Sequence, residues 1–314
     1  MQNPKDALKN TPKNNVFIAI KEEGETPLEC LIRQKEEGLL PNDKFTYAGR
    51  LDPMASGLML FLRGEAILEK DKYLALDKEY EVEVLFGIST DTGDILGKIN
   101  SVANSHSDSR SSGDSDVAFD IKNIKNVCDS LIGETGVPYP WFSSKTINGK
   151  ALHEIFRAGD DLHDDSEVGD VARPLTKLSI QNIEILDFYM LQSDSMLKNI
   201  EKRIAKVNGD FRQDEILQKW QSVLSEQKHV QNGSQKNMQN KMQAKGSVNG
   251  NVRGNVSFPI LKIKVECKSG SYMRTLAELL AEKLKTCGLA YSIKRIRVGE
   301  FDGFSFCKKT HKKL

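Results

Sequence analysis

The sequence predicts an α+β fold, because patterns typical of strands and patterns typical of helices both occur along its 314 residues. Residues 79–86 and 260–265 alternate apolar and charged side chains, as a strand does when one of its faces meets water. Residues 121–132 and 276–285 follow the helical period instead, with apolar side chains three and four positions apart. A chain of this length can bury a large core, in one large domain or two smaller ones.

The beginning of the chain predicts a polar tail, a strand and a helix. Residues 1–14 are polar, and we expect them to be disordered. Residues 16–20 are a short β-prone run, and a helix is expected to start after Thr26, which suits an N-cap. Pro27 at the first helical position and Glu29 in the first turn strengthen that prediction.

Two stretches differ in composition from the rest of the chain. Residues 101–118 hold seven serines and predict a flexible surface loop. Residues 191–257 open with two helical patterns, which predict a helical hairpin. In residues 229–257, 17 of 29 side chains are Gln, Asn, Gly or Ser, and so little apolar surface cannot offset the entropy of ordering. We therefore expect disorder there, followed by strands and a helix up to about residue 304.

Charge and cysteine content narrow the possible functions. Basic and acidic residues nearly cancel overall, but residues 257–314 hold 13 Lys/Arg and 5 Asp/Glu, a local charge of +8 (13 − 5). Such a segment is either the footprint of phosphate contacts or a solvated surface with a charged tail. Five cysteines without a CxxC pair indicate a reduced, cytoplasmic protein. Scattered histidines, no Gly-rich phosphate loop and no apolar run of about 18 residues argue against a metal, a nucleotide cofactor and a membrane span.

One carboxylate stands out in the segment YAGRLDPMASG, residues 47–57. Asp52 precedes Pro53, so it is pushed out of the helical region, and Gly49 and Gly57 permit unusual backbone angles on either side. An apolar run follows directly. These residues by themselves fit either a lone catalytic carboxylate at the edge of a core or an Asx-turn that bonds its own backbone.

Four segments, taken in order, resemble the TruB-type tRNA pseudouridine synthases. The family pattern G-x-L-D-P-x-A-x-G matches the Asp52 loop, and K-x-Y followed by T-D-T-x-D-x-x-G matches residues 78–97. A loop with Pro, Ser, Lys and Asn-Gly matches residues 137–150, and G-x-Y-x-R-T-L-A matches residues 270–277. The resemblance leaves out residues 101–118 and 191–257, and the latter stretch is called the insertion below.

The resemblance implies a fold and a reaction for a catalytic domain over residues 15–304. The expected pseudouridine synthase fold is a large mixed, mainly antiparallel sheet with flanking helices and a central RNA cleft. The family reaction detaches a uridine from its ribose at N1 and rejoins it through C5, without a metal or other cofactor. The expected substrate is the T-arm of tRNA, at uridine 55. We expect a monomer without an obligatory protein partner or a membrane.

Three residues correspond to the family's catalytic groups. Asp52 matches the aspartate that attacks the nucleoside or assists glycosidic cleavage. Arg274 matches the arginine that pairs with it, and a planar guanidinium can hold a carboxylate by two hydrogen bonds. Tyr80 matches the tyrosine whose ring can stack on the flipped uracil and whose hydroxyl is placed for proton transfer from C5.

Other residues are expected to contact the RNA or to wall the pocket. Leu58 and Ile293 could equally be plain core, and Lys21 falls where the family has a basic residue near the active site. The substrate-binding candidates are Tyr47, Lys21, Leu58, Ile293, Lys145 and Tyr272. The candidates for phosphate contacts are Lys145, Lys150, Arg157, Lys294, Arg295 and Arg297.

Departures from the family pattern leave room for different functions. Tyr47 stands where most bacterial members have His, and Arg50 gives a GRLD sequence similar to families that modify ribosomal RNA.

A non-catalytic RNA-binding module on the same fold is a second hypothesis, and a carboxylate hydrolase that uses Asp52 with Glu65 is a third. We expect a basic tail at residues 305–314 and no C-terminal RNA-binding domain, and we hypothesise that the insertion helps to grip RNA.

Overall fold

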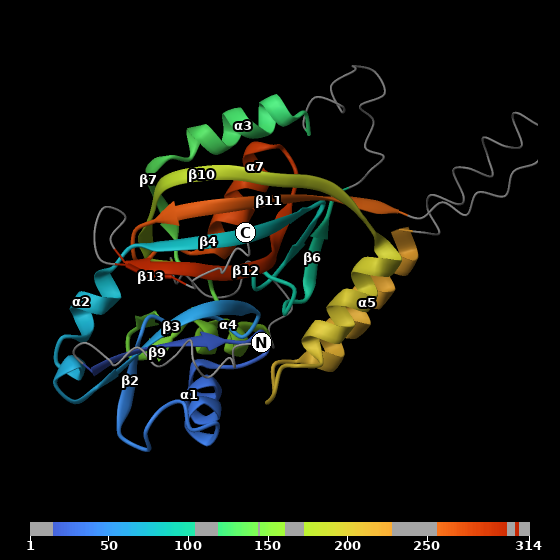
Figure 1. Ribbon diagram of the computed structural model, residues 1–314. Coiled ribbons are helices and arrows are strands. Elements are labelled where there is room, and N and C mark those ends of the chain that lie inside the picture. The colour runs from blue at the N-terminus through green and yellow to red at the C-terminus, as the bar shows by residue number, and fades with distance from the viewer. Residues whose placement is uncertain are drawn as a thin grey trace, which may run out of the picture.

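A large twisted sheet organises the molecule (Figure 1). The computed structural model describes residues 15–103, 119–143, 145–160, 173–227, 256–299 and 305–307. Within these residues the strand order is β1-β3-β12-β4-β11-β10-β7, with β2 paired to β3 and β13 paired to β12. The strands are β1 (Val16–Lys21), β2 (Phe45–Ala48), β3 (Ala55–Arg63), β4 (Lys78–Phe86), β7 (Gly133–Pro138), β10 (Leu175–Gln192), β11 (Ser257–Cys267), β12 (Gly288–Gly299) and β13 (Ser305–Cys307).

The pairing directions confirm the predicted mixed, mainly antiparallel sheet. In the part of the chain that the structure describes, β12 runs parallel to β3, and the other ladders of this sheet are antiparallel. Two small hairpins lie outside it, β5 (Ile88–Thr90) with β6 (Ile99–Val102) and β8 (Thr146–Ile147) with β9 (Lys150–Ala151). The central RNA cleft stays a prediction.

Helices pack around the sheet, as an α+β fold requires. They are α1 (Pro27–Glu36), α2 (Lys70–Ala75), α3 (Ile121–Ser130), α4 (Leu152–Asp160), α5 (Ser193–Ile204), a helix over residues 213–227 and α7 (Met273–Lys283), with a 3₁₀ turn over Gly64–Ile67. Thr26 caps α1, since its side chain accepts the Glu29 N–H while the Glu29 carboxylate accepts the Thr26 N–H. The predicted start of this helix is therefore confirmed.

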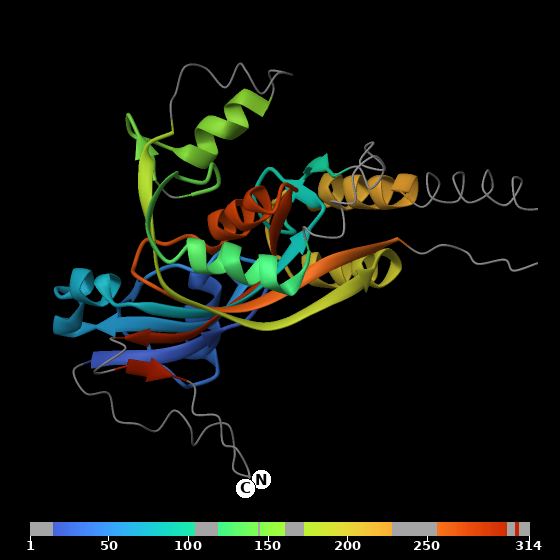
Figure 2. The same ribbon diagram turned by 90° about the horizontal axis from the view of Figure 1, so that it is seen from above.

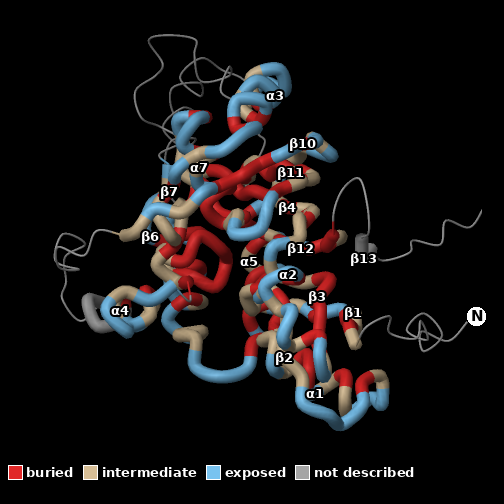
Figure 3. Tube along the Cα trace, turned by 90° about the vertical axis from the view of Figure 1, so that its left-hand side faces the viewer, coloured by how far each residue is buried: buried red, intermediate tan, exposed pale blue. Residues whose placement is uncertain are grey.

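The two faces of the sheet bury different cores. Along β4, Tyr80, Val82 and Val84 point into a core that also contains Met273 and Leu276 of α7. Leu85 points the other way, because side chains alternate along a strand. Figure 2 shows α7 on one side of the sheet, while Figure 3 shows buried residues concentrated along the central strands and α7.

The insertion forms two packed helices in its described part. Their buried side chains share a core with the β5–β6 hairpin and with Leu85 and Leu289 of the sheet, and this core is called the hairpin core. The insertion contributes Met196, Ile200, Ile204, Val207, Ile216, Trp220, Val223 and Leu224 to it. Figure 1 shows α5 beside β6, at the end of β10 and β11. The apolar faces of the two insertion helices are thus covered by the rest of the protein.

Several predicted boundaries are wrong. Residues 305–307 form β13, which pairs with Arg297–Gly299 of β12, so the sheet extends into the expected tail. Ser101 and Val102 belong to β6 and not to a flexible loop. The predicted disorder at residues 1–14 and 228–255 lies outside the described residues, as does most of the Ser-rich loop. Among the described helices, none is both long and apolar enough to cross a membrane.

Candidate active site

The Asp52 loop joins β2 to β3 and is fixed mainly by its backbone. The Pro53 carbonyl accepts the Gly24 N–H at 2.8 Å, and the Asp52 carbonyl accepts the Ala55 N–H at 3.0 Å. Gly57, at φ +114°, lies so close to the Arg295 backbone that a Cβ there would clash with it. The predicted glycine requirement at this end of the loop is therefore steric as well as conformational.

Lys21, at the end of β1, lies beneath this loop and is fully buried. Its ammonium donates to the carbonyls of Pro53 at 3.1 Å and Ala55 at 2.6 Å, which flank Asp52, and to that of Glu22 at 3.0 Å. Burial lowers the pKa of Lys21 to about 8. We expected a substrate contact, but a buried ammonium occupied by backbone carbonyls positions the loop instead.

Arg274, in the first turn of α7, reaches the Asp52 carboxylate. Its Nε lies 2.9 Å from Oδ2 of Asp52, without the alignment of a hydrogen bond, so the contact is an ion pair. The expected two-bond grip on the carboxylate is wrong. The other two nitrogens donate to the carbonyls of Thr92 at 2.7 Å and Phe142 at 2.8 Å, which fix the orientation of the guanidinium.

The side chains of Asp52 and Arg274 differ in their exposure to solvent. The Arg274 side chain is 4% exposed and that of Asp52 is 41% exposed, so the carboxylate alone is open to a ligand. Burial opposes the charge on Arg274, but the carboxylates of Asp52 and Asp94 outweigh it and raise the pKa of Arg274. Asp94 is buried and accepts hydrogen bonds from the Thr92 hydroxyl at 2.8 Å and the Leu96 N–H at 2.9 Å.

Tyr80 lies in β4 between β11 and β12, opposite Val265 and Arg295. The residue is buried, and burial raises the pKa of its hydroxyl, while the neighbouring Arg295 guanidinium opposes the shift. The charge of Asp52 also acts on this hydroxyl. Tyr80 therefore stays protonated near neutral pH.

The predicted phosphate contact of Arg295 is wrong. It is 2% exposed, and its Nε donates to the Leu58 carbonyl at 2.7 Å, so it cannot reach an RNA backbone. Arg297 is engaged as well, with Glu79 at 2.9 Å. Lys294 is exposed. Sequence reasoning treated the three as one basic run. Alternation along β12 separates Lys294 from Arg295, and a register shift between Arg295 and Arg297 places these two opposite Tyr80 and Glu79.

Leu58 and Ile293 occupy different parts of the core. The Leu58 side chain is buried with Leu60 and Leu62 in a cluster apart from Tyr80, which indicates a core residue. Ile293 shares the core of Tyr80, and it pairs with Ala55 at the end of the Asp52 loop. Of the two, Ile293 is therefore the one placed beside the candidate site.

Two aromatic groups with nearby cations lie around the Asp52 loop. In the first, Tyr272 packs edge-on against Tyr139 at 5.8 Å between ring centroids, and the ammonium of Lys145 lies 5.5 Å from the Tyr139 ring. Burial raises the pKa of Tyr272, and the charge of Asp52 acts in the same direction. Lys145 is exposed. Rings that accept stacked bases beside cations that attract phosphates suit single-stranded nucleic acid.

Tyr47 forms the second group, on β2. Its ring lies beneath the guanidinium of Arg50 at 5.8 Å and the ammonium of Lys70 at 6.0 Å. Tyr47 is partly exposed and Arg50 is exposed. Lys150 is exposed too, and the side chain of Arg157 lies outside the described residues.

Lys78 is a buried cation that sequence reasoning placed in a motif but gave no role. Its ammonium donates to the Leu74 carbonyl at 2.6 Å and to the Ser269 hydroxyl at 2.9 Å, which ties β4 to the turn before α7. Burial lowers its pKa to about 8. The signal was present, because Lys78 is in phase with the buried residues Tyr80 and Val82 along β4.

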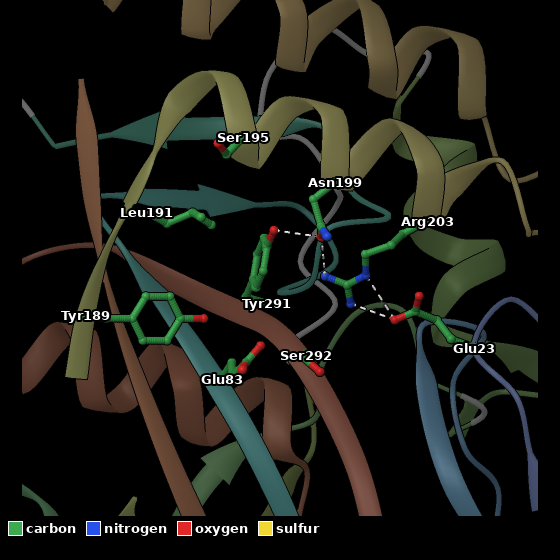
Figure 4. Close-up of a pocket in the computed structure, with 9 residues that line it drawn as sticks. All are labelled: Glu23, Glu83, Tyr189, Leu191, Ser195, Asn199, Arg203, Tyr291 and Ser292. Atoms are coloured by element: carbon green, nitrogen blue, oxygen red, sulfur yellow. Dashed lines mark hydrogen bonds and ion pairs between the residues drawn. The ribbon is translucent and has the colours of Figure 1, made fainter. Parts of the chain in front are cut away.

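Two further features bear on ligands. Among the described residues, no group of three or more His, Cys, Asp or Glu side chains could hold a metal ion. A cavity of about 400 Å³ lies between α5 and the sheet, and Asp52 is not among its lining residues. Figure 4 shows Asn199 paired with Tyr291 and Arg203, and Arg203 paired with Glu23. The cavity is lined by Glu23, Glu83, Tyr189, Leu191, Ser195, Asn199, Arg203, Tyr291 and Ser292.

Comparison with known proteins identifies the family. The tRNA pseudouridine synthase B of Caldicellulosiruptor saccharolyticus is 25% identical over 82% of this chain and 59% of its own length. That of Endomicrobium trichonymphae is 25% identical over 89% of this chain and 82% of its own. A crystal structure of a Cbf5-Nop10-Gar1 complex is 15% identical over 95% of this chain and 51% of that one, with a TM-score of 0.46. Residues 37–205 match the model described as TruB family pseudouridylate synthase (N terminal domain), and the chain therefore belongs to that family.

Proposed function

We propose that this chain converts a specific uridine of tRNA to pseudouridine, the activity named in its relatives. The observation that carries the proposal is the ion pair of Asp52 and Arg274 at 2.9 Å. The charge of the same carboxylate also acts on the Tyr80 hydroxyl and raises its pKa. Three family motifs, distant in sequence, supply these three side chains. The chain spans 59% of one relative's length, so the activity of the whole relative is part of the proposal.

The three side chains divide the reaction between them. Asp52 is the nucleophilic carboxylate that attacks the nucleoside or assists cleavage of the bond between N1 and the ribose. Arg274 places a buried positive charge 2.9 Å from that carboxylate. The uracil turns, a bond forms from C5 to the ribose, the C5 proton leaves and N1 gains a proton. Tyr80 stacks on the flipped base and donates or relays a proton through its hydroxyl.

The proposed substrate is the T-arm of tRNA, with uridine 55 as the target. A stacked base must be extruded at a cost of a few kcal/mol, and contacts to the flanking RNA offset that cost. The ring and cation groups at Tyr272 with Lys145 and at Tyr47 with Arg50 are placed to supply them. No cofactor and no obligatory protein partner enter the reaction, and a cytoplasmic monomer is sufficient for it.

The hydrolase hypothesis is disfavoured by geometry. Asp52 precedes β3 and Glu65 follows it, and a nine-residue strand at roughly 3.3 Å per residue separates them by about 25 Å. Paired carboxylates in glycoside hydrolases lie within roughly 10 Å of each other. Modification of ribosomal RNA differs from the proposed function only in substrate and is decided by assay.

The test is pseudouridine formation on an unmodified tRNA transcript, read by chemical labelling and primer extension. Wild type should modify uridine 55, and Asp52→Asn should form only a trace of product in the same time, whereas Asp43→Asn should match wild type. Asp43 is a suitable control because it is exposed and pairs only with surface Arg63 in the described ion pairs. Equal product from Asp52→Asn and wild type would refute the mechanism. Product on a ribosomal RNA fragment and none on tRNA would show that ribosomal RNA, and not tRNA, is the substrate.

A further inference from the structure

The insertion reaches the residues that hold the catalytic pair. Arg212 lies in the turn between its two helices, and its Nη2 is 2.9 Å from Oδ2 of Asp91. The same guanidinium lies 5.0 Å from the ring centroid of Phe142. Asp91 immediately precedes Thr92, and the carbonyls of Thr92 and Phe142 are the two that hold Arg274. One insertion residue therefore contacts Phe142 itself and Asp91, the chain neighbour of Thr92.

The backbone at Arg212 is strained, which indicates that its side-chain contacts outweigh the strain. Its φ is +62°, in the left-handed region that favours glycine over a residue with a Cβ. The Arg212 and Asp91 side chains are only 15% and 11% exposed, so little solvent screens the pair. Asp91 is itself fixed, because its Oδ1 accepts the Lys98 N–H at 2.9 Å.

The first insertion helix holds the other side of the catalytic pair. Arg203 and Lys206 both bind the Glu23 carboxylate, with Arg203 Nη2 at 2.7 Å and Lys206 Nζ at 3.3 Å (Figure 4 shows the Arg203 contact). Gly24 is packed directly on the Lys206 backbone, where a Cβ would lie 2.6 Å from the Lys206 Cβ. The Gly24 N–H in turn binds the Pro53 carbonyl in the Asp52 loop.

The charge of the helical hairpin disagrees with a role in gripping RNA. Residues 192–227 contain 6 Lys/Arg and 6 Asp/Glu, a net charge of zero (6 − 6). Three of those cations, Arg203, Lys206 and Arg212, bind carboxylates of the core. Residues 228–255 contain 5 Lys/Arg and no Asp/Glu, so any electrostatic attraction to RNA belongs to that sequence and not to the hairpin.

We propose that the hairpin is a brace for catalysis, in which Arg212 is a positioning residue that holds the Asp91 and Phe142 loops and thereby aims Arg274 at Asp52. The proposal rests on the function proposed above. It replaces, for residues 192–227, the hypothesis that the insertion grips RNA. The brace acts on the chemical step and leaves tRNA affinity unchanged.

Arg212→Gly is the sharpest test, because glycine relieves the left-handed backbone while it removes the clamp. Gln221→Ala is the matched control, since it breaks a 2.9 Å hydrogen bond between the two insertion helices, from Gln221 to Glu201, and leaves the Asp91 and Phe142 contacts of Arg212 in place. Arg212→Gly should slow single turnover at saturating tRNA at least tenfold and change Kd for tRNA less than twofold. The single-turnover rate of Arg212→Lys should fall between those of wild type and Arg212→Gly, because lysine keeps the charge but loses the flat contact with Phe142.

Amide hydrogen exchange of the full-length chain separates this inference from the proposed function. Exchange in peptides covering residues 90–94 and 139–143 should rise at least tenfold in Arg212→Gly and stay at the wild-type level in Gln221→Ala. Unchanged exchange and turnover in Arg212→Gly would overturn the brace, and so would weaker tRNA binding with unchanged turnover. If wild type forms no pseudouridine, the proposed function fails, and the exchange result alone decides the brace.

Discussion

Lys21, at the base of the Asp52 loop, and Arg274, at the start of α7, are both buried cations held by backbone carbonyls. Their pKa values shift in opposite directions. Lys21 donates hydrogen bonds to three backbone carbonyls, and Arg274 donates to two. Burial dominates at Lys21 and lowers its pKa to about 8. At Arg274 the carboxylates of Asp52 and Asp94 outweigh burial and raise the pKa.

Under the proposed function, the difference separates a cation that fixes the loop backbone from a cation that takes part in catalysis. A cation that binds only carbonyls fixes a backbone, and its charge is a cost that the fold tolerates. A cation that faces an exposed carboxylate stabilises the ionised form of that carboxylate. Lys21 therefore positions Asp52, and Arg274 sets its electrostatic environment. The predictions below test that division, starting with the largest effect.

Of the two buried cations, Arg274 should have the larger effect on rate when it is lost. Arg274→Gln removes the charge next to Asp52, and we expect single turnover to slow by about 10³-fold, the size typical of losing a preorganised electrostatic partner. Arg63→Gln, which breaks the surface pair with Asp43, is the control and should stay within twofold of wild type. A loss below tenfold in Arg274→Gln would remove Arg274 from the catalytic group.

Loss of Lys21 should slow the reaction through geometry. Lys21→Met keeps the length of the side chain but leaves the Pro53 and Ala55 carbonyls without their donor, so the Asp52 loop loosens. We expect turnover to slow by about 10²-fold with unchanged tRNA affinity, since small misplacements near the chemistry have effects of that order. A change confined to Kd would instead make Lys21 an RNA contact.

The lowered pKa of Lys21 predicts a pH dependence of stability. The folded pKa is about 8 against an ordinary 10.5, so the charged form is disfavoured on folding. That penalty is complete below pH 8 and is relieved as pH rises from 8 to 10.5. The free energy of unfolding of wild type, relative to Lys21→Met, should rise by about 1–3 kcal/mol across that window. Urea unfolding at several pH values measures it, and a flat difference would contradict the assignment.

Tyr47 should give the smallest effect, limited to RNA binding. Tyr47→Ala removes a ring that lies under Arg50 and Lys70, and we expect tRNA affinity to weaken by about tenfold, as for the loss of one stacking platform. Tyr47→His should restore most of the affinity, because the family residue can stack as well. An unchanged Kd in Tyr47→Ala would show that the ring does not meet the RNA.

The family resemblance carried by the motifs predicted the sheet and the meeting of Asp52 with Arg274, and the capping residues predicted the first helix. The sequence could not place Arg295, because a run of basic residues in a strand looks like surface until the strand's neighbours are known. Packing between β3 and β4 buries that residue. Arg212 carried no motif at all, and its role depends on a turn in the insertion that local pattern does not specify.

The most direct test of the catalytic pair is a double-mutant cycle on single-turnover rates with Asp52→Asn, Arg274→Gln and the double variant. If Arg274 acts through Asp52, the double variant should be no slower than Asp52→Asn alone, because residues that act as a unit are strongly non-additive. Losses that multiply in the double variant would contradict a shared role. They would assign Arg274 to a step that does not involve Asp52.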